Sequence, residues 1–173
     1  TSSSVCAKNV SQDISGKMFT DEACTAETSD FAAALYGDIA YWATQGTWRL
    51  PTQAELQKLY NEASYQYGYY TTEDGKNGYL FTPPMKSGRV ENTSARQITD
   101  EELVGGLFLP ATGYRIYPGS TISKSGEVGY YWTSQYRSAG DNDYAYYLEL
   151  QPTQIRWAGN ASYYGRSVRP VKN

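Results

Sequence analysis

Tyrosine takes the place of aliphatic residues in this chain, and this limits the kind of core that the chain can build. The 173 residues include 18 Tyr and 4 Trp, against 27 Ile, Leu, Val and Phe residues together. So low an aliphatic content is typical of disorder when the net charge is large, but here the formal net charge is only -3. A chain of this length can bury most of its surface as one domain. We therefore expect a folded domain whose core and surface both depend on tyrosine.

Composition excludes several classes of function. The chain has no histidine, which excludes a Ser-His-Asp or Cys-His nucleophile, a His-ligated zinc and a haem on a proximal His. It has 15 basic and 18 acidic residues without a basic cluster, so no nucleic-acid partner is expected. No apolar run approaches the roughly 18 residues of a membrane span, so direct membrane insertion is not expected.

Two cysteines, Cys6 and Cys24, lie in an N-terminal arm of residues 1–27. In an oxidising compartment, a disulfide between them would tether this arm. Two unrelated free thiols are the alternative, and spacing alone does not decide between them. A metal site here is disfavoured because no other soft ligand completes it.

Helices are expected first and strands afterwards. Apolar spacing and N-cap signals predict helices at 28–45, from the Thr52–Glu55 capping box to Ala63, and as a single turn from the Thr99–Glu102 box to Gly105. Short apolar or aromatic runs between turn residues predict strands at 107–110, 113–117, 129–134, 144–150, 154–157 and 166–171. The polar stretch between them, within 68–106, is expected to be an inserted loop region, with a short hairpin as an alternative for part of it. The expected fold class is α+β, with two helices packed on a twisted, mostly antiparallel sheet with long loops.

Four segments resemble a known fold family. They are Trp48-Arg49-Leu50-Pro51-Thr52-Gln53-Ala54-Glu55-Leu56, Phe108-Leu109-Pro110-Ala111-Thr112-Gly113-Tyr114-Arg115, Gly129-Tyr130-Tyr131-Trp132-Thr133-Ser134 and Gly165-Arg166-Ser167-Val168-Arg169-Pro170-Val171. Their order resembles the C-type lectin fold of the formylglycine-generating-enzyme (sulfatase-modifying factor) type. It is similar to variable proteins of diversity-generating retroelements and to the paralogous surface domains of Fibrobacter and Bacteroidetes. The resemblance implies a C-type lectin-like domain over residues 28–173, with a ligand-binding C-terminal segment at 129–173.

The segment from Gln135 to Tyr164 is rich in Tyr, Ser, Asn, Asp, Ala and Gly. Antibody paratopes favour similar residues, because Tyr offers a large rigid contact area while small polar residues adapt their hydrogen bonds. Six tyrosines are expected on this recognition surface: Tyr136, Tyr144, Tyr146, Tyr147, Tyr163 and Tyr164. The candidate ligand-binding residues are Tyr136, Arg137, Ser138, Asp141, Asn142, Tyr144, Tyr146, Arg156, Trp157, Ala158, Asn160, Ser162, Tyr163 and Tyr164.

The resemblance also implies which positions could vary. In retroelement-diversified proteins, replacing adenines lets Asn-type codons encode Tyr, Ser, Asp, Gly, Ala, Thr, Arg or Ile, but not Lys, Glu, Gln, Met or Trp. By that rule, four residues of the segment belong to the scaffold: Glu149, Gln151, Gln154 and Trp157. The alternative is a fixed surface, whose tyrosines line strands because aromatic residues suit sheets.

We expect a non-enzymatic receptor or adhesin domain that recognises a protein or glycan on another cell or host surface through an exposed Tyr-rich face. By the resemblance it is a variable protein of a diversity-generating retroelement, outside the cell on a bacterial surface or a phage particle. There are two alternatives. The first is an undiversified surface or fimbrial adhesin, and the second, which we rank below it, is an enzyme using Glu149, Asp141 and Asp143. No cofactor or metal is expected. The Gln151-Pro152-Thr153 tripeptide lacks the third oxygen ligand of calcium-dependent lectins. No cysteine follows Cys24, so formylglycine-generating activity does not carry over.

Overall fold

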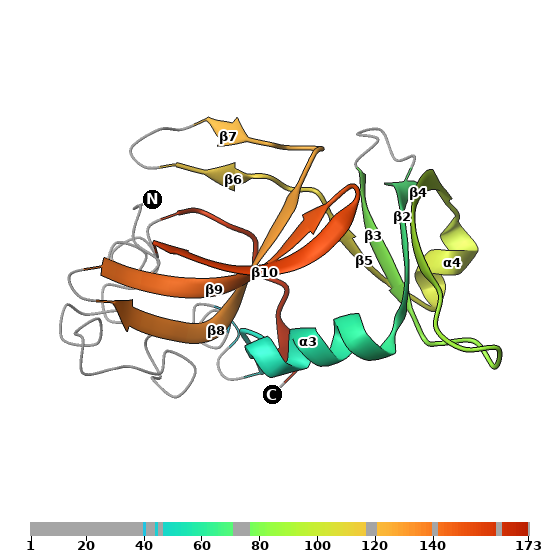
Figure 1. Ribbon diagram of the computed structural model, residues 1–173, viewed down its shortest axis with the longest axis horizontal. Helices are drawn as coiled ribbons and strands as arrows, with labels where there is room; N and C mark the ends of the chain where they lie inside the picture. Colours follow the sequence, from blue (N-terminus) through green and yellow to red (C-terminus); the bar gives the residue numbers. More distant parts are fainter. Residues whose placement is uncertain are drawn as a thin grey trace.

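The computed structural model in Figure 1 describes most of the chain from residue 47 onward. The described residues are 40, 44, 47–70, 77–116, 121–139, 142–161 and 164–172, with the backbone alone at 136–139, 142, 143 and 161. The elements are β1 (Trp48–Arg49), α3 (Gln53–Glu62), β2 (Ser64–Tyr70), β3 (Asn77–Thr82), β4 (Glu91–Ile98), α4 (Asp100–Val104), β5 (Leu107–Pro110), β6 (Tyr114–Arg115), β7 (Ile122–Ser123), β8 (Gly129–Ala139), β9 (Asn142–Gln151), β10 (Gln154–Ala161) and β11 (Val171–Lys172).

The described residues form a mixed α+β structure, mostly strands, in several small sheets. The largest sheet has the order β4-β2-β3-β5 and the next has the order β10-β9-β8, while β1 pairs with β11 and β6 with β7. The predicted α+β class is therefore confirmed. The prediction of one sheet is wrong, because the strands separate into groups with independent registers. The β2–β4 pair is also parallel. Strand β3 ends beside the start of β2, and β4 then begins at that same end, along the other edge of β2.

Helix α3 begins where its capping box predicts. The Glu55 N–H donates to Thr52 Oγ1 at 3.2 Å, and the Thr52 N–H donates to Glu55 Oε2 at 2.8 Å. Arg49 donates to both carboxylate oxygens of Glu55, at 2.8 and 2.6 Å. Leu56 is buried, and the helix lies against β8 and β9 (Figure 1). The cap fixes where α3 starts, and Leu56 anchors it to the core.

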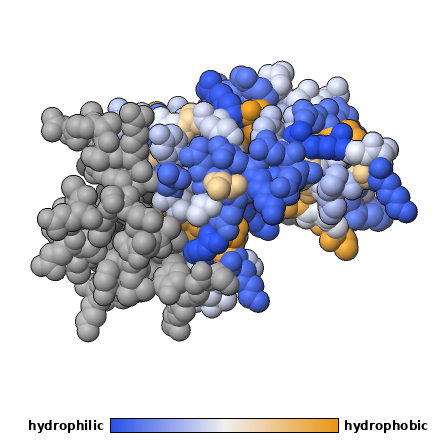
Figure 2. Space-filling view, turned by 60° about the horizontal axis from the view of Figure 1, so that its bottom comes forward, coloured by the Kyte–Doolittle hydropathy of each residue, from blue (hydrophilic) through white to orange (hydrophobic). Residues whose placement is uncertain are grey.

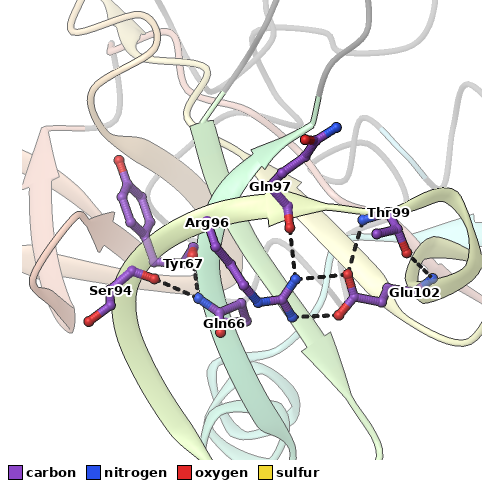
Figure 3. Close-up of polar contacts among 7 residues, drawn as sticks. All are labelled: Gln66, Tyr67, Ser94, Arg96, Gln97, Thr99 and Glu102. Atoms are coloured by element: carbon purple, nitrogen blue, oxygen red, sulfur yellow. Dashed lines mark hydrogen bonds and ion pairs between the residues drawn. The ribbon is translucent and has the colours of Figure 1, made fainter.

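A second Arg-x-x-Thr-x-x-Glu segment starts α4 (Figure 3). Arg96 contacts both carboxylate oxygens of Glu102, and the Thr99 N–H donates to Glu102 Oε2 at 3.0 Å. Beside it, Gln66 Nε2 donates to the Ser94 carbonyl at 2.7 Å and so links β2 to β4. The predicted turn is confirmed, but α4 has five residues and none is buried. It therefore does not act as a second helix packed on a sheet.

The predicted helix at 28–45 and the arm at 1–27, with Cys6 and Cys24, lie outside the described residues except for Ala40 and Thr44. Ala40 is helical and buried. Among the described residues, no helix is both long and apolar enough to cross a membrane.

Tyrosine fills the larger of the two core clusters. Tyr65 and Tyr67 of β2 and Tyr79 of β3 are buried there together with Phe81. The Tyr79 hydroxyl donates to the Gln151 carbonyl at 2.8 Å, which satisfies the polar end of a ring that is 0% exposed. The tyrosine excess thus replaces missing aliphatic residues at the centre of the fold.

The prediction of a loop at 68–106 is wrong for most of the backbone, although the alternative of a hairpin there agrees with the antiparallel β2–β3 pair. The end of β2, all of β3 and β4, and α4 lie within it. Strand β3 is buried on both faces, so it shows no alternation of apolar and polar residues. Strand β4 is a polar edge strand, exposed along most of its length, so no apolar pattern marks it.

Two facing glycines let neighbouring strands of the four-stranded sheet approach each other closely. Gly68 pairs directly with Gly78. A Cβ atom at Gly68 would lie 2.2 Å from the Arg96 carbonyl oxygen, and one at Gly78 would lie 2.5 Å from the Leu109 carbonyl oxygen. Because both neighbours are backbone atoms, neither position can accept a side chain without moving a strand.

The C-terminal strands differ in length from their predictions. The strand at 107–110 is confirmed as β5, the one at 113–117 shortens to β6, and those at 129–134, 144–150 and 154–157 extend to β8, β9 and β10. The strand at 166–171 is wrong except at Val171, because residues 165 and 167 form only isolated bridges. In β8, residues 131–133 are all buried, so neither face of the strand is open to solvent there. The Trp132 N–H donates to the Ser167 carbonyl at 3.0 Å, so the chain end covers this strand.

Candidate functional site

The β10-β9-β8 sheet carries the segment predicted to bind a ligand. In the antiparallel β9–β10 pair, Tyr146 lies opposite Gly159 and Tyr147 lies opposite Ala158. Opposed residues share one face of a sheet, and successive residues of a strand alternate between faces. The predicted site residues are therefore divided between two opposite faces of this sheet.

The first face, which we call the tyrosine face, bears Tyr144, Tyr146 and Gly159. Both tyrosines are half-buried. A Cβ atom at Gly159 would lie 3.5 Å from Tyr146 Cδ1, so the ring rests directly over the glycine backbone. Trp157 is on the same face and packs against the larger core cluster. The face is thus interior near Trp157 and reaches the surface at the two tyrosines, where β8 and β9 run on beyond the core (Figure 1).

The opposite face, which we call the cage face, bears Tyr130, Trp132, Tyr147, Glu149 and Arg156. The predicted site residues Ala158 and Asn160 are on this side too, because they lie opposite Tyr147 and Ala145. Ala158 is half-buried and packs against the smaller core cluster of Leu50, Trp132, Ala145 and Tyr147. Arg156, Ala158 and Asn160 therefore cannot join Tyr144 and Tyr146 in one contact surface.

Arg156 makes an ion pair on the cage face. Its Nε and Nη2 donate to the two carboxylate oxygens of Glu149 at 2.9 and 3.0 Å, and Gln151 Nε2 donates to Glu149 Oε1 at 2.6 Å. Glu149 is 3% exposed, whereas the Arg156 side chain is 53% exposed. Gln154 Nε2 in turn donates to Gln151 Oε1 at 2.8 Å. Removing Arg156 would leave a buried carboxylate with one amide partner, so Arg156 has a structural role whatever it contacts outside.

Arg166, which is not among the predicted site residues, sits within a ring of aromatic side chains on the cage face. Its Cζ lies over four rings, at 5.4 Å from the centroid of Tyr130, 4.6 Å from Trp132, 3.7 Å from Tyr147 and 5.0 Å from Tyr164. Burial lowers the pKa of the Arg166 guanidinium, while the neighbouring Tyr147 and Tyr130 oppose that shift. These four residues span 35 positions, so no local sequence pattern could have found the cluster.

Tyr147 was expected on the recognition surface, and this expectation is wrong. It is 6% exposed, and its ring packs against both Arg166 and Trp132. Tyr164 is half-buried and packs against the same cluster. All four residues assigned to the scaffold by the codon rule have structural partners: Glu149, Gln151 and Gln154 in the ion-pair network, and Trp157 in the core.

Other predicted site residues are described in part or lie outside the described residues. The backbone of Tyr136, Arg137, Ser138 and Asn142 forms the far end of the β8–β9 pair. Asp141, Ser162 and Tyr163 lie outside the described residues.

The predicted carboxylates of the enzyme alternative do not form a pair within β9. Asp143 and Glu149 are six residues apart on one continuous strand, which places their Cα atoms about 20 Å apart. Glycosidase carboxylates lie roughly 5 to 9.5 Å apart. Among the residues whose side chains are described, no group of three metal-ligating residues occurs.

Comparison with models of known families, with curated proteins and with solved structures found no significant match to this chain.

Proposed function

We propose that this chain is a ligand-binding domain, a receptor or adhesin, that recognises a protein or glycan through the tyrosine face. The observation that carries the proposal is the pair Tyr144 and Tyr146, two half-buried rings on one face of β9 with only a glycine opposite Tyr146. Ala145 and Tyr147, which alternate with them and lie on the opposite face, are buried and anchor the strand.

The surface chemistry supports recognition by amphipathic side chains. On the side of the molecule shown in Figure 2, hydrophilic residues cover most of the described surface, and apolar residues form small, separate areas. A tyrosine ring gives apolar contact area and a hydroxyl at one end, and it loses little conformational entropy when it binds. Two such rings on a fixed strand can act as binding hot spots without a large apolar patch.

The retroelement-diversified version of the proposal has some structural support. Glu149, Gln151 and Trp157, which the codon rule excludes from variation, have interior or network contacts. Tyr144 and Tyr146, which the rule allows to vary, are half-buried and have no role in the ion-pair network. Arg156 is an exception, because variation there would remove the partner of Glu149.

Binding to arrays of glycans and of cell-surface proteins tests the proposal. The full chain should bind a restricted set of probes, and the double variant Tyr144→Ala/Tyr146→Ala should lose about 30-fold or more in affinity, as expected for a hot-spot pair. Tyr69→Ala is the matched control, since Tyr69 is a 38% exposed tyrosine in β2 of the four-stranded sheet. Equal losses from both variants, with unfolding temperatures unchanged, would contradict a role for the tyrosine face.

Gene context separates the two versions of the proposal. A diversified receptor should have a reverse transcriptase gene nearby, together with a near-copy of the last coding segment that differs at adenines. If both are missing from the genome, the domain is an undiversified adhesin, and the binding proposal itself is unaffected.

A further inference from the structure

Arg166 differs from the other arginines whose contacts the structure describes. Four of them pair with a carboxylate: Arg49 with Glu55, Arg89 with Glu91, Arg96 with Glu102 and Arg156 with Glu149. The Nε and Nη1 atoms of Arg166 are buried without any hydrogen-bond partner among the described residues. A charge that is partly buried and has no ion-pair partner among the described residues is costly, so this guanidinium calls for a specific explanation.

The aromatic rings around Arg166 stabilise its charged guanidinium in part. Rings of four residues lie within 5.4 Å of its Cζ, and the Tyr147 ring lies closest. Ring faces attract a cation through their negative potential, most strongly where water is excluded. They supply no negative charge, however, so they do not neutralise Arg166, and Glu149 is the described carboxylate that acts on its charge.

The neighbouring carboxylate is already engaged. Glu149 accepts hydrogen bonds from Arg156 and from Gln151. The described part of the cage face therefore holds two guanidinium groups and one carboxylate. The nearby tyrosines add no negative charge, since burial and then Glu149 raise the pKa of Tyr130 to about 12. The described side chains of this face thus carry more positive than negative charge, although the chain as a whole carries a net charge of -3.

Tyrosine rings form the outer layer over this charge. Tyr114, Tyr130 and Tyr164 are all half-buried. The Tyr114 ring meets the other two edge to face, at centroid distances of 5.1 and 5.9 Å. Exposed Arg156 lies across Glu149 from Tyr130 on the same face. It uses Nε and Nη2 for Glu149, so its Nη1 lies on the other side of the guanidinium.

We propose that the cage face is a second binding site, for an acidic saccharide that carries a carboxylate or a sulfate. The anion contacts Arg156 and is attracted by the charge of Arg166 behind the rings. The C–H face of the sugar stacks on the outer tyrosines, Tyr114, Tyr130 and Tyr164. The Arg166 guanidinium can attract the anion through the rings, because aromatic side chains screen a charge less than water does. A saccharide suits the site better than an acidic peptide, because the rings flank the charge and offer both apolar faces and hydroxyl groups.

Titration of the unmodified full chain tests this assignment. The probes are glucuronic acid and galactose 6-sulfate, with glucose and galactose as neutral partners at matched ionic strength. The NMR signal of the Arg166 Nε–H, shifted by the surrounding rings, gives a local readout. Each acidic sugar should shift this signal and bind at least about tenfold more tightly than its neutral partner. Binding by only one acidic sugar identifies the anion that the site takes.

Two arginine variants separate local charge from net charge. Arg166→Gln should lose about tenfold or more in affinity for the acidic sugars. Arg169→Gln is the matched control, since Arg169 is an exposed arginine three residues further along the same segment, and its affinity should stay within about twofold. Equal losses in both variants overturn the proposal. If Arg166→Gln does not fold, the Nε–H titration of the unmodified chain decides alone.

Three further results would overturn the proposal. These are equal affinity for acidic and neutral sugars, equal affinity for sodium sulfate and galactose 6-sulfate, and binding of an acidic peptide in place of the sugars. The double variant Tyr144→Ala/Tyr146→Ala should keep its affinity for the acidic sugars. That result separates this site from the tyrosine face, so either proposal can fail without the other.

Discussion

The segments Arg49–Glu55 and Arg96–Glu102 use the same chemistry in two different surroundings. In each, a threonine and a glutamate cap a helix reciprocally, and an arginine three residues before the threonine binds the glutamate. Helix α3 then runs for ten residues and buries Leu56, whereas α4 ends after five and buries none. The cap decides where a helix begins, and burial of an apolar side chain decides whether it continues.

Side-chain truncation in the two helices should give the largest contrast. Leu56→Ala should lower the free energy of unfolding by about 3 kcal/mol, because Leu56 is 4% exposed within the larger core cluster. Val104→Ala should change it by less than about 0.5 kcal/mol, because Val104 is 91% exposed. Urea unfolding measures both values. Similar losses would mean that burial is not what distinguishes α3 from α4.

Removing each cap comes next in size. Thr52→Ala should cost about 1 kcal/mol of global stability, because α3 unfolds together with the core. Thr99→Ala should have a smaller global effect, because α4 can open locally without exposing any buried residue. Hydrogen exchange should show faster exchange confined to α4 in Thr99→Ala. A uniform increase across the four-stranded sheet would show that α4 is coupled to the core after all.

Acid should weaken both caps. The hydrogen bond from Arg49 and then the Thr52 N–H hold the pKa of Glu55 at about 2, and Arg96 with Thr99 does the same for Glu102. The ordinary value is 4.5, so the stabilisation is complete above that pH and is lost as the pH falls toward 2. After solvent screening, each glutamate should contribute about 1 kcal/mol or less. Glu55→Gln and Glu102→Gln should each flatten the fall in stability between these pH values, and an unchanged slope would argue against the ion pairs.

Exchanging arginine for lysine should have the smallest effect. Lysine keeps the charge but cannot hold both carboxylate oxygens in a planar fork. Arg49→Lys should cost about 0.5 kcal/mol, and Arg96→Lys less, because the Arg96 side chain is 44% exposed against 25% for Arg49. Paired urea titrations would resolve the difference, and a larger cost at Arg96 would reverse this ranking.

Local signals predicted local structure well. Both capping boxes and strand β5 lie where the sequence places them, since each depends on neighbours within a few residues. The alternation of Tyr65 and Tyr67 with polar residues in β2 was a usable signal for a strand that went unrecognised. Strand β4 offered no signal, because its pairing with β2 buries almost none of its side chains.

The candidate site was predicted as a segment but not as a surface. The sequence located the tyrosines of β9, yet the assignment of Tyr147 to the surface ignored the alternation that turns it away from Tyr146. The cage around Arg166 depends on contacts between segments that are distant along the chain. Such contacts become predictable only once the strand registers are known.

The alternation along β9 also governs how this segment can change over generations. Replacing Tyr144 or Tyr146 alters one surface and leaves Tyr147 and Glu149 undisturbed on the other. Inserting or deleting one residue in the part of β9 that precedes Glu149 would exchange the two surfaces. Tyrosines of the tyrosine face would then point toward the cage around Arg166. A lineage, or a laboratory library built on this hairpin, can therefore vary residue identity freely at the outward positions but has to keep the length of the strand constant.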